Sequence, residues 1–123
     1  MKKTFLLFSL LMISLLAIAQ NPCPQVIPAL QEWKGTKGTL HLPIQGSIII
    51  NPSDETLLAS TAAILKNDLK ELMGWEYTII TGKAKKNSIF LSLSEPDEQL
   101  GKEGYELSII NKVSIQAPTA QGV

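Results

Sequence analysis

An amphipathic helix pattern over residues 53–73 constrains the fold of this chain more than any other feature of the sequence. Apolar residues recur there at alternating spacings of four and three, which places their side chains along one stripe of a helix. The stripe consists of Leu58, Ala62, Leu65, Leu69 and Leu72. Ser53 is predicted to be the N-cap, and Asp54 and Glu55 would lie in the first turn, where the helix dipole favours negative charge. Gly74 suits the left-handed position that ends a helix. Such a helix has to bury its stripe against another part of the fold.

Short β patterns surround this helix. Three consecutive isoleucines from Ile48 to Ile50 are typical of a strand buried on both faces, and alternation of apolar and polar residues indicates the other strands. The predicted strands cover residues 39–42, 47–50, 77–81, 88–93, 105–109 and 113–117. The last two would form a hairpin with one apolar face and a two-residue turn at Asn111-Lys112. This order predicts an α+β fold, in which a helix covers one face of a mixed or antiparallel sheet of five to six strands.

A single helix is a narrow cover for a sheet of that size. Residues 118–123 begin neither a further strand nor a capped helix. We therefore expect that the sequence stops within the domain, just before another element begins.

The N-terminal segment has the three parts of a secretory signal peptide in the usual order. A basic start at Met1–Thr4 precedes an apolar run from Phe5 to Ile18, and Ala17 and Ala19 form a small-x-small cleavage signature before Gln20. The apolar run is shorter than the roughly 20 residues that a membrane-spanning helix needs. The sequence therefore predicts export to the periplasm or the exterior, with no membrane attachment after cleavage.

Cleavage before Gln20 would divide the chain into residues 1–19, the signal peptide, residues 20–27, an extended leader, and residues 28–123, one domain. All basic residues are lysines, and loss of two of the 11 lysines with the signal peptide leaves a small excess of the 11 acidic residues. This balance does not favour binding to nucleic acid. Cys23 is the single cysteine, so no internal disulfide can form, and the residues before it do not fit a lipoprotein signal.

Few residues are candidates for chemistry. They are His41, the carboxylate pairs Asp54-Glu55 and Asp97-Glu98, the lysines Lys83, Lys85 and Lys86, and the aromatic residues Trp33, Trp75 and Tyr77. A lone histidine has no partner for a metal ion, and adjacent carboxylates need burial to separate their pKa values. The lysines would lie at a solvated hairpin tip, and the aromatic rings are expected to pack rather than bind sugar. The sequence predicts no catalytic, metal or cofactor site.

Several segments carry a family resemblance. Glu103–Leu107 fits an E-G-Y-x-L strand, Val113–Ala117 fits a V/I-x-I-x-A strand, and Thr119–Val123 fits the small-residue turn that follows. With Pro28–Trp33, these segments resemble the N-terminal accessory domain of family 20 glycoside hydrolases, the β-N-acetylhexosaminidases. The resemblance covers about residues 26–123, and it implies that the second covering helix of the accessory domain is missing from this chain.

The resemblance implies a non-catalytic role. In that family a (β/α)₈ barrel follows the accessory domain and holds an Asp-Glu pair. The Glu protonates the glycosidic oxygen, and the Asp orients the substrate's 2-acetamido group, which attacks the anomeric carbon. No residue of this chain matches those positions. The chain would be a secreted fragment that packs against a barrel absent from it, in a parent enzyme that hydrolyses terminal N-acetylhexosamines.

Two other interpretations stay open. The aromatic residues would also suit a free-standing secreted module that binds a carbohydrate or a protein. Related accessory domains with an E-G-Y strand precede the barrels of O-GlcNAc hydrolases and α-glucuronidases, although the stretch from Ala117 to Gly122 favours the hexosaminidases.

Overall fold

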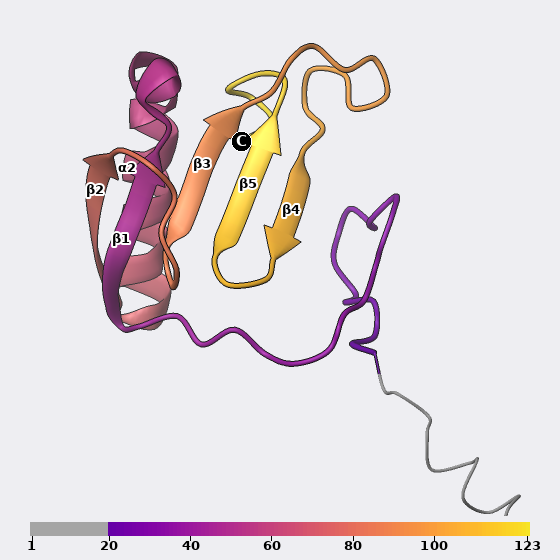
Figure 1. Ribbon diagram of the computed structural model, residues 1–123, viewed down its shortest axis with the longest axis horizontal. Helices are drawn as coiled ribbons and strands as arrows, with labels where there is room; N and C mark the ends of the chain where they lie inside the picture. The colour runs from indigo at the N-terminus through magenta and orange to yellow at the C-terminus, as the bar shows by residue number, and fades with distance from the viewer. Residues whose placement is uncertain (1–19) are drawn as a thin grey trace, which may run out of the picture. The chain divides into compact units, whose positions relative to one another are not determined.

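The computed structural model describes residues 20–123, which belong to two separate compact units. The first unit ends at Thr39, and its residues from Gln20 onward contain no helix or strand. The second unit, Leu40–Val123, holds one sheet and one long helix (Figure 1). The predicted signal peptide, with Ala17 and Ala19, lies outside the described residues, whereas Gln20 is exposed.

The described part of the first unit is a loop tied together at Asn21. The Asn21 backbone N–H donates to the Thr36 carbonyl at 2.9 Å, and its side-chain amide donates to the Gly38 carbonyl at 2.9 Å. The Trp33 indole N–H donates to the Asn21 carbonyl at 3.2 Å. A Cβ atom on Gly35 would collide with that same carbonyl, so this tie requires a glycine there. Trp33 is 46% exposed, and what it contributes to this loop is the hydrogen bond to Asn21.

The second unit is built on a five-stranded mixed sheet, which confirms the α+β class. Its strands are β1 (Gln45–Ile50), β2 (Glu76–Thr81), β3 (Ile89–Leu93), β4 (Glu106–Ile109) and β5 (Val113–Ala117). Their order across the sheet is β2-β1-β3-β5-β4, and β4 alone runs antiparallel to its neighbour (Figure 1). The isoleucines of β1 are fully buried, as expected of a strand with partners on both sides.

Helix α2 (Glu55–Met73) connects β1 to the parallel strand β2. Its N-cap is Asp54, because a 3₁₀ turn, η1 (Pro52–Asp54), precedes it, so the prediction of Ser53 as N-cap was wrong. Gly74 ends the helix with a φ of 70°, as predicted. Gly74 N–H donates to the Lys70 carbonyl at 3.0 Å, which is the bond of the αL cap motif, and Trp75 N–H donates to the Leu69 carbonyl at 3.1 Å.

Most of the predicted apolar stripe of α2 faces the sheet. Leu58 and Ala62 are buried, and Leu65 and Leu69 pack against the core. Leu72 was predicted to join them, but it is 83% exposed. The cause is length: a helix of 19 residues spans about 28 Å, whereas a strand of six residues spans about 20 Å, so the last turn extends past the sheet.

The predicted strand at residues 39–42 does not form. Both edges of β1 are already occupied, one by β2 and the other by β3, so no position beside β1 remains for it. Leu42 still packs against the core, and the carbonyl of Pro43 accepts a hydrogen bond from the Tyr77 hydroxyl at 2.8 Å. His41 is exposed, as the sequence indicated.

Two of the connections between strands differ from the predicted ones. Ile109 pairs with Val113, so residues 110–112 form a three-residue loop instead of a two-residue turn at Asn111-Lys112. The segment 82–88 is not a hairpin tip, because β1 lies between β2 and β3 and the segment has to cross it (Figure 1). A right-handed crossover in this direction runs over the face opposite α2. There Ile49 is fully buried without any helix above it.

Candidate functional site

The residues with chemically reactive side chains are dispersed over the second unit. The lysines Lys83, Lys85 and Lys86 are exposed on the crossover segment, and Glu98 is exposed as well. The Asp97 carboxylate accepts the Gln99 N–H at 2.8 Å and so stabilises a turn. Over residues 20–123, no three His, Cys, Asp or Glu side chains are grouped to hold a metal ion. None of the helices described there has the length and apolar character to span a membrane.

Asp54 is the exception among the acidic residues, because its side chain is only 8% exposed. One carboxylate oxygen accepts the Leu93 backbone N–H and the Asn51 side-chain amide, both at 2.9 Å, and the other accepts the Ser53 hydroxyl at 2.9 Å. Burial acts to raise the pKa of Asp54, but these three hydrogen bonds outweigh it and hold the pKa below its usual value of 3.8. The carboxylate therefore ties the start of α2 to the end of β3. Sequence reasoning missed its burial, because its neighbours are polar.

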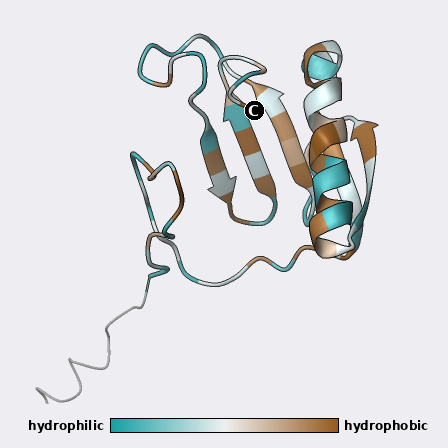
Figure 2. Cartoon of the chain, turned by 180° about the vertical axis from the view of Figure 1, so that it is seen from behind, coloured by the Kyte–Doolittle hydropathy of each residue, from teal (hydrophilic) through white to brown (hydrophobic). Residues whose placement is uncertain are grey.

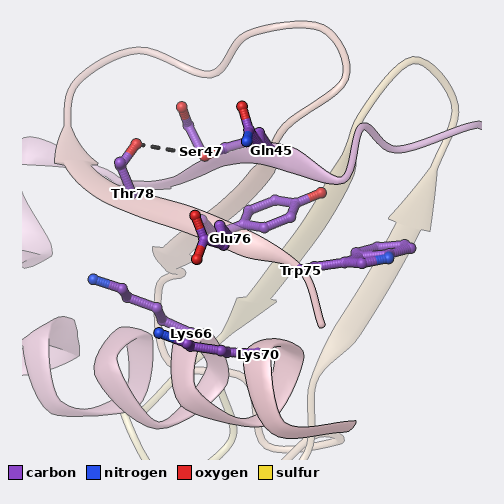
Figure 3. Close-up of a pocket in the computed structure, with 9 residues that line it drawn as sticks. Gln45, Ser47, Lys66, Lys70, Trp75, Glu76 and Thr78 are labelled. Carbon is purple, nitrogen blue, oxygen red and sulfur yellow. Dashed lines mark hydrogen bonds between the residues drawn. The ribbon is translucent and has the colours of Figure 1, made fainter. Parts of the chain in front are cut away.

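A hollow of about 580 Å³ lies along the free edge of β2, beside α2 (Figure 3). It is lined by Gln45, Gly46, Ser47, Lys66, Lys70, Trp75, Glu76, Tyr77 and Thr78. The Trp75 indole lies at one end of it and the two lysine side chains at the other, with the Glu76 carboxylate between them (Figure 3). Sequence analysis singled out Trp75 but not the polar residues beside it, because strand pairing brings those together.

Tyr77 is closely packed against Gly46 at the wall of this hollow. Gly46 and Tyr77 are partners in the β1–β2 register, and a Cβ atom on Gly46 would lie 2.6 Å from the tyrosine ring. The missing side chain of Gly46 therefore makes room for the ring. Trp75 stacks on Tyr77 with ring centroids 6.1 Å apart and an interplanar angle of 19°. The Tyr77 hydroxyl donates to the Pro43 carbonyl at 2.8 Å, and burial raises the pKa of this hydroxyl.

A second surface feature is an apolar region on the α2 side of the sheet, over the strands β5 and β4 that the helix does not cover. We call this region the open face. Residues directly opposite in the register share a face, so this region continues the one that carries Ile48 and Leu91. It consists of Tyr105, Leu107, Ile109, Val113 and Ile115. Leu107 is 51% exposed and Ile109 is 49% exposed. Figure 2 shows hydrophobic strand segments beside the helix and not beneath it.

The helix adds apolar side chains to the border of the open face. Leu57 and Ile64 are both more than half exposed, and they lie seven residues apart on one flank of α2. Lys66 and Lys70 occupy the opposite flank, beside β2, according to the 100° rotation per residue of an α-helix. The flank with Leu57 and Ile64 therefore points away from β2 and toward the β5 side.

The strand motif at Glu103–Leu107 and the turn motif at Thr119–Val123 meet at Gly104 and Gly122. A Cβ atom on Gly122 would lie 2.5 Å from the Gly104 carbonyl oxygen and 2.7 Å from the Ala117 Cβ. The Thr119 hydroxyl donates to the Lys102 carbonyl nearby. The strand motif around Gly104 and the turn motif around Gly122 are therefore close neighbours, and this contact requires a glycine at position 122. Gly104 has a different reason to lack a side chain, because its Cβ would collide with the Leu100 carbonyl.

Comparison with known families gives a match that spans both units. Residues 23–123 match the family described as glycosyl hydrolase family 20, domain 2. No curated protein matches the chain. The match includes the helix, all five strands and the Gly104–Gly122 contact. The chain therefore belongs to glycosyl hydrolase family 20 through its domain 2, the non-catalytic N-terminal accessory domain of these enzymes.

Proposed function

We propose that the chain is the accessory-domain part of an exported β-N-acetylhexosaminidase. In this proposal the parent enzyme removes terminal N-acetylhexosamines in a catalytic barrel, and this domain packs against the barrel. The family match supports the accessory role. The signal-peptide pattern of residues 1–19 supports export to the periplasm or the exterior.

The observation that carries the proposal is the open face. Apolar patches of this kind on a folded domain mark places where another protein segment packs. Tyr105, Leu107 and Ile109 are each about half exposed on a sheet face that is otherwise a core. We propose that a helical segment of the parent enzyme covers them, between β4 and the α2 flank with Leu57 and Ile64.

An activity assay tests this assignment of roles. The chain alone should release no p-nitrophenol from p-nitrophenyl N-acetyl-β-D-glucosaminide, and the product of the gene with its downstream coding sequence should release it. Substrate release by the chain alone would refute the non-catalytic role. An inactive extended product, or one active only on a glucuronide, would refute the hexosaminidase assignment while leaving the accessory role intact.

A further inference from the structure

The outer edge of β2 presents a row of backbone groups that pair with no strand among residues 20–123, because β2 is the outermost strand at one end of the sheet (Figure 1). The Glu76 N–H donates to the Ile44 carbonyl at 2.9 Å, so the backbone groups of Glu76 point toward β1. This direction alternates along a strand. The N–H and C=O groups of Tyr77, Ile79 and Thr81 therefore point outward, away from β1.

The sequence of β2 lacks the features that usually protect an edge strand. Glu76–Thr81 contains no proline, no lysine and no glycine, and it is six residues long, whereas β4 at the other edge has four. Its last four residues, from Thr78 to Thr81, are all β-branched and favour the extended conformation. An edge of this kind can add another strand.

The hollow of about 580 Å³ at this edge is lined from both faces of the sheet. Tyr77 belongs to the core beneath α2, so strand alternation places Glu76 and Thr78 on the opposite face. Lys66 and Lys70 of the lining lie on the α2 side. Groups on two faces of a sheet do not converge on one small ligand, so the hollow is better explained as space beside an edge that a second strand can occupy.

The α2 side of this edge carries opposite charges at its two ends. Lys66 and Lys70 line the hollow together with the first residues of β2, so this end is positive. Glu55 lies within about 60° of both lysines around the helix, at 100° per residue. Because α2 connects the parallel strands β1 and β2, it runs antiparallel to them, and its first residue lies beside the end of β2. This end is therefore negative.

The opposite face of the sheet carries the reverse arrangement. Glu76 lies there at the start of β2, and Lys83 follows the end of β2 on the crossover segment over that face. If two β2 strands pair antiparallel, Glu55 comes near Lys70 of the second copy, and Glu76 comes near Lys83 of the second copy. All four side chains are exposed and available for such contacts. Parallel pairing would bring like charges together on both faces.

We propose that two copies of this chain pair antiparallel through their β2 edges and form one continuous sheet, with a two-fold axis at Ile79. Tyr77 pairs with Thr81 of the second copy, and Ile79 pairs with its own counterpart. Each pair exchanges two backbone hydrogen bonds, about six in all. The dimer goes beyond the proposed accessory role and does not depend on it, because the open face lies over β5 and β4 at the other end of the sheet.

Sedimentation velocity and hydrogen–deuterium exchange of the purified exported chain test this proposal. The chain should sediment as a monomer when dilute and as a dimer when concentrated, and added NaCl should weaken the association. The backbone amides of Tyr77, Ile79 and Thr81 should exchange about tenfold more slowly in the concentrated sample. The amides of Glu106–Ile109, at the other edge of the sheet, should exchange equally in both samples.

Charge reversal tests the antiparallel arrangement. Glu55→Lys and Lys70→Glu should each weaken dimerisation about tenfold, because each places like charges together twice across the two-fold axis. The two substitutions combined should restore it. Lys102→Glu is the matched control, since Lys102 is exposed outside this edge, and Leu107→Gln is the control for association through the open face. Neither control should change the dissociation constant of the dimer.

Circular dichroism of each variant separates loss of pairing from loss of fold. A chain that stays monomeric at millimolar concentration would overturn the proposal. A dimer that leaves exchange in β2 unchanged, or that Leu107→Gln dissociates, would overturn the assignment to the β2 edge. If Glu55→Lys and Lys70→Glu together weaken the dimer more than either alone, the antiparallel arrangement is wrong.

Discussion

Leu107 of β4 and Ile115 of β5 lie directly opposite each other on the sheet face that forms the core beneath α2, yet half of the Leu107 side chain is exposed. The core beneath α2 and the open face are therefore one continuous apolar surface of which the helix covers only the β2, β1 and β3 part. This relationship explains why a chain with a well-packed core presents a large apolar region at the same time.

Substitutions in the covered and the open part of this surface should differ in their effect on the free energy of unfolding. Leu107→Gln should reduce binding of the dye ANS and slow aggregation, with a change of at most about 0.5–1 kcal/mol in the free energy of unfolding. Leu91 is the matched control, because it lies on the same face but is fully buried. Leu91→Ala should cost about 2–5 kcal/mol in urea denaturation. Equal destabilisation by both substitutions would show that Leu107 is buried in solution.

Asp54 should make stability depend on acid pH. Its pKa is lowered in the folded state, so the ionised carboxylate stabilises the fold. This stabilisation is complete above the unfolded pKa of about 3.8 and is lost as the pH falls through the lower folded pKa. Asp54→Asn should lower the free energy of unfolding by about 1–3 kcal/mol at pH 7.

Urea denaturation from pH 7 down to about pH 3 measures this difference. The gap between wild type and Asp54→Asn should narrow in the acid range, because protonation removes the same charge from the wild type. A gap that stays constant would mean that the carboxylate charge is not what stabilises the helix–β3 junction. Asp68→Asn is the matched control, since Asp68 is exposed on α2.

Gly46→Ala should destabilise the fold although it adds only one methyl group. The added Cβ would lie 2.6 Å from Cε1 of Tyr77, and the tyrosine ring is 2% exposed, so it has little space in which to move. We expect a loss of about 1–3 kcal/mol and a change in the near-UV circular dichroism of the Trp75–Tyr77 stack. Gly82→Ala is the control, because nothing lies within 4 Å of its Cβ position.

Export should follow from the N-terminal pattern. In a bacterial host, a chain that carries residues 1–19 should accumulate outside the cytoplasm and begin at Gln20, as N-terminal sequencing would show. Ala19→Arg should block processing and leave the longer form. Unprocessed wild-type chain in the cytoplasm would contradict the signal-peptide prediction.

The parts of the fold that sequence could predict are those fixed by local pattern. The position of α2 was predicted from apolar residues spaced four and three apart and from Gly74 at its end. The position of β1 was predicted from the run of isoleucines. Both signals arise within one segment of the chain. The strand order was beyond reach, since β3 pairs with β1 and β5 through contacts between distant segments. The same holds for the hollow: Gln45 and Glu76 become neighbours only through the β1–β2 pairing.

Hydrogen–deuterium exchange at β4 tests the central claim most directly. The claim is that this domain belongs to a larger family 20 enzyme whose other parts cover the open face. The backbone amides of Glu106–Ile109 should exchange quickly in the chain alone and at least tenfold more slowly in the product of the extended gene, while exchange in β1 changes little. Equal exchange of β4 in both proteins would contradict the claim.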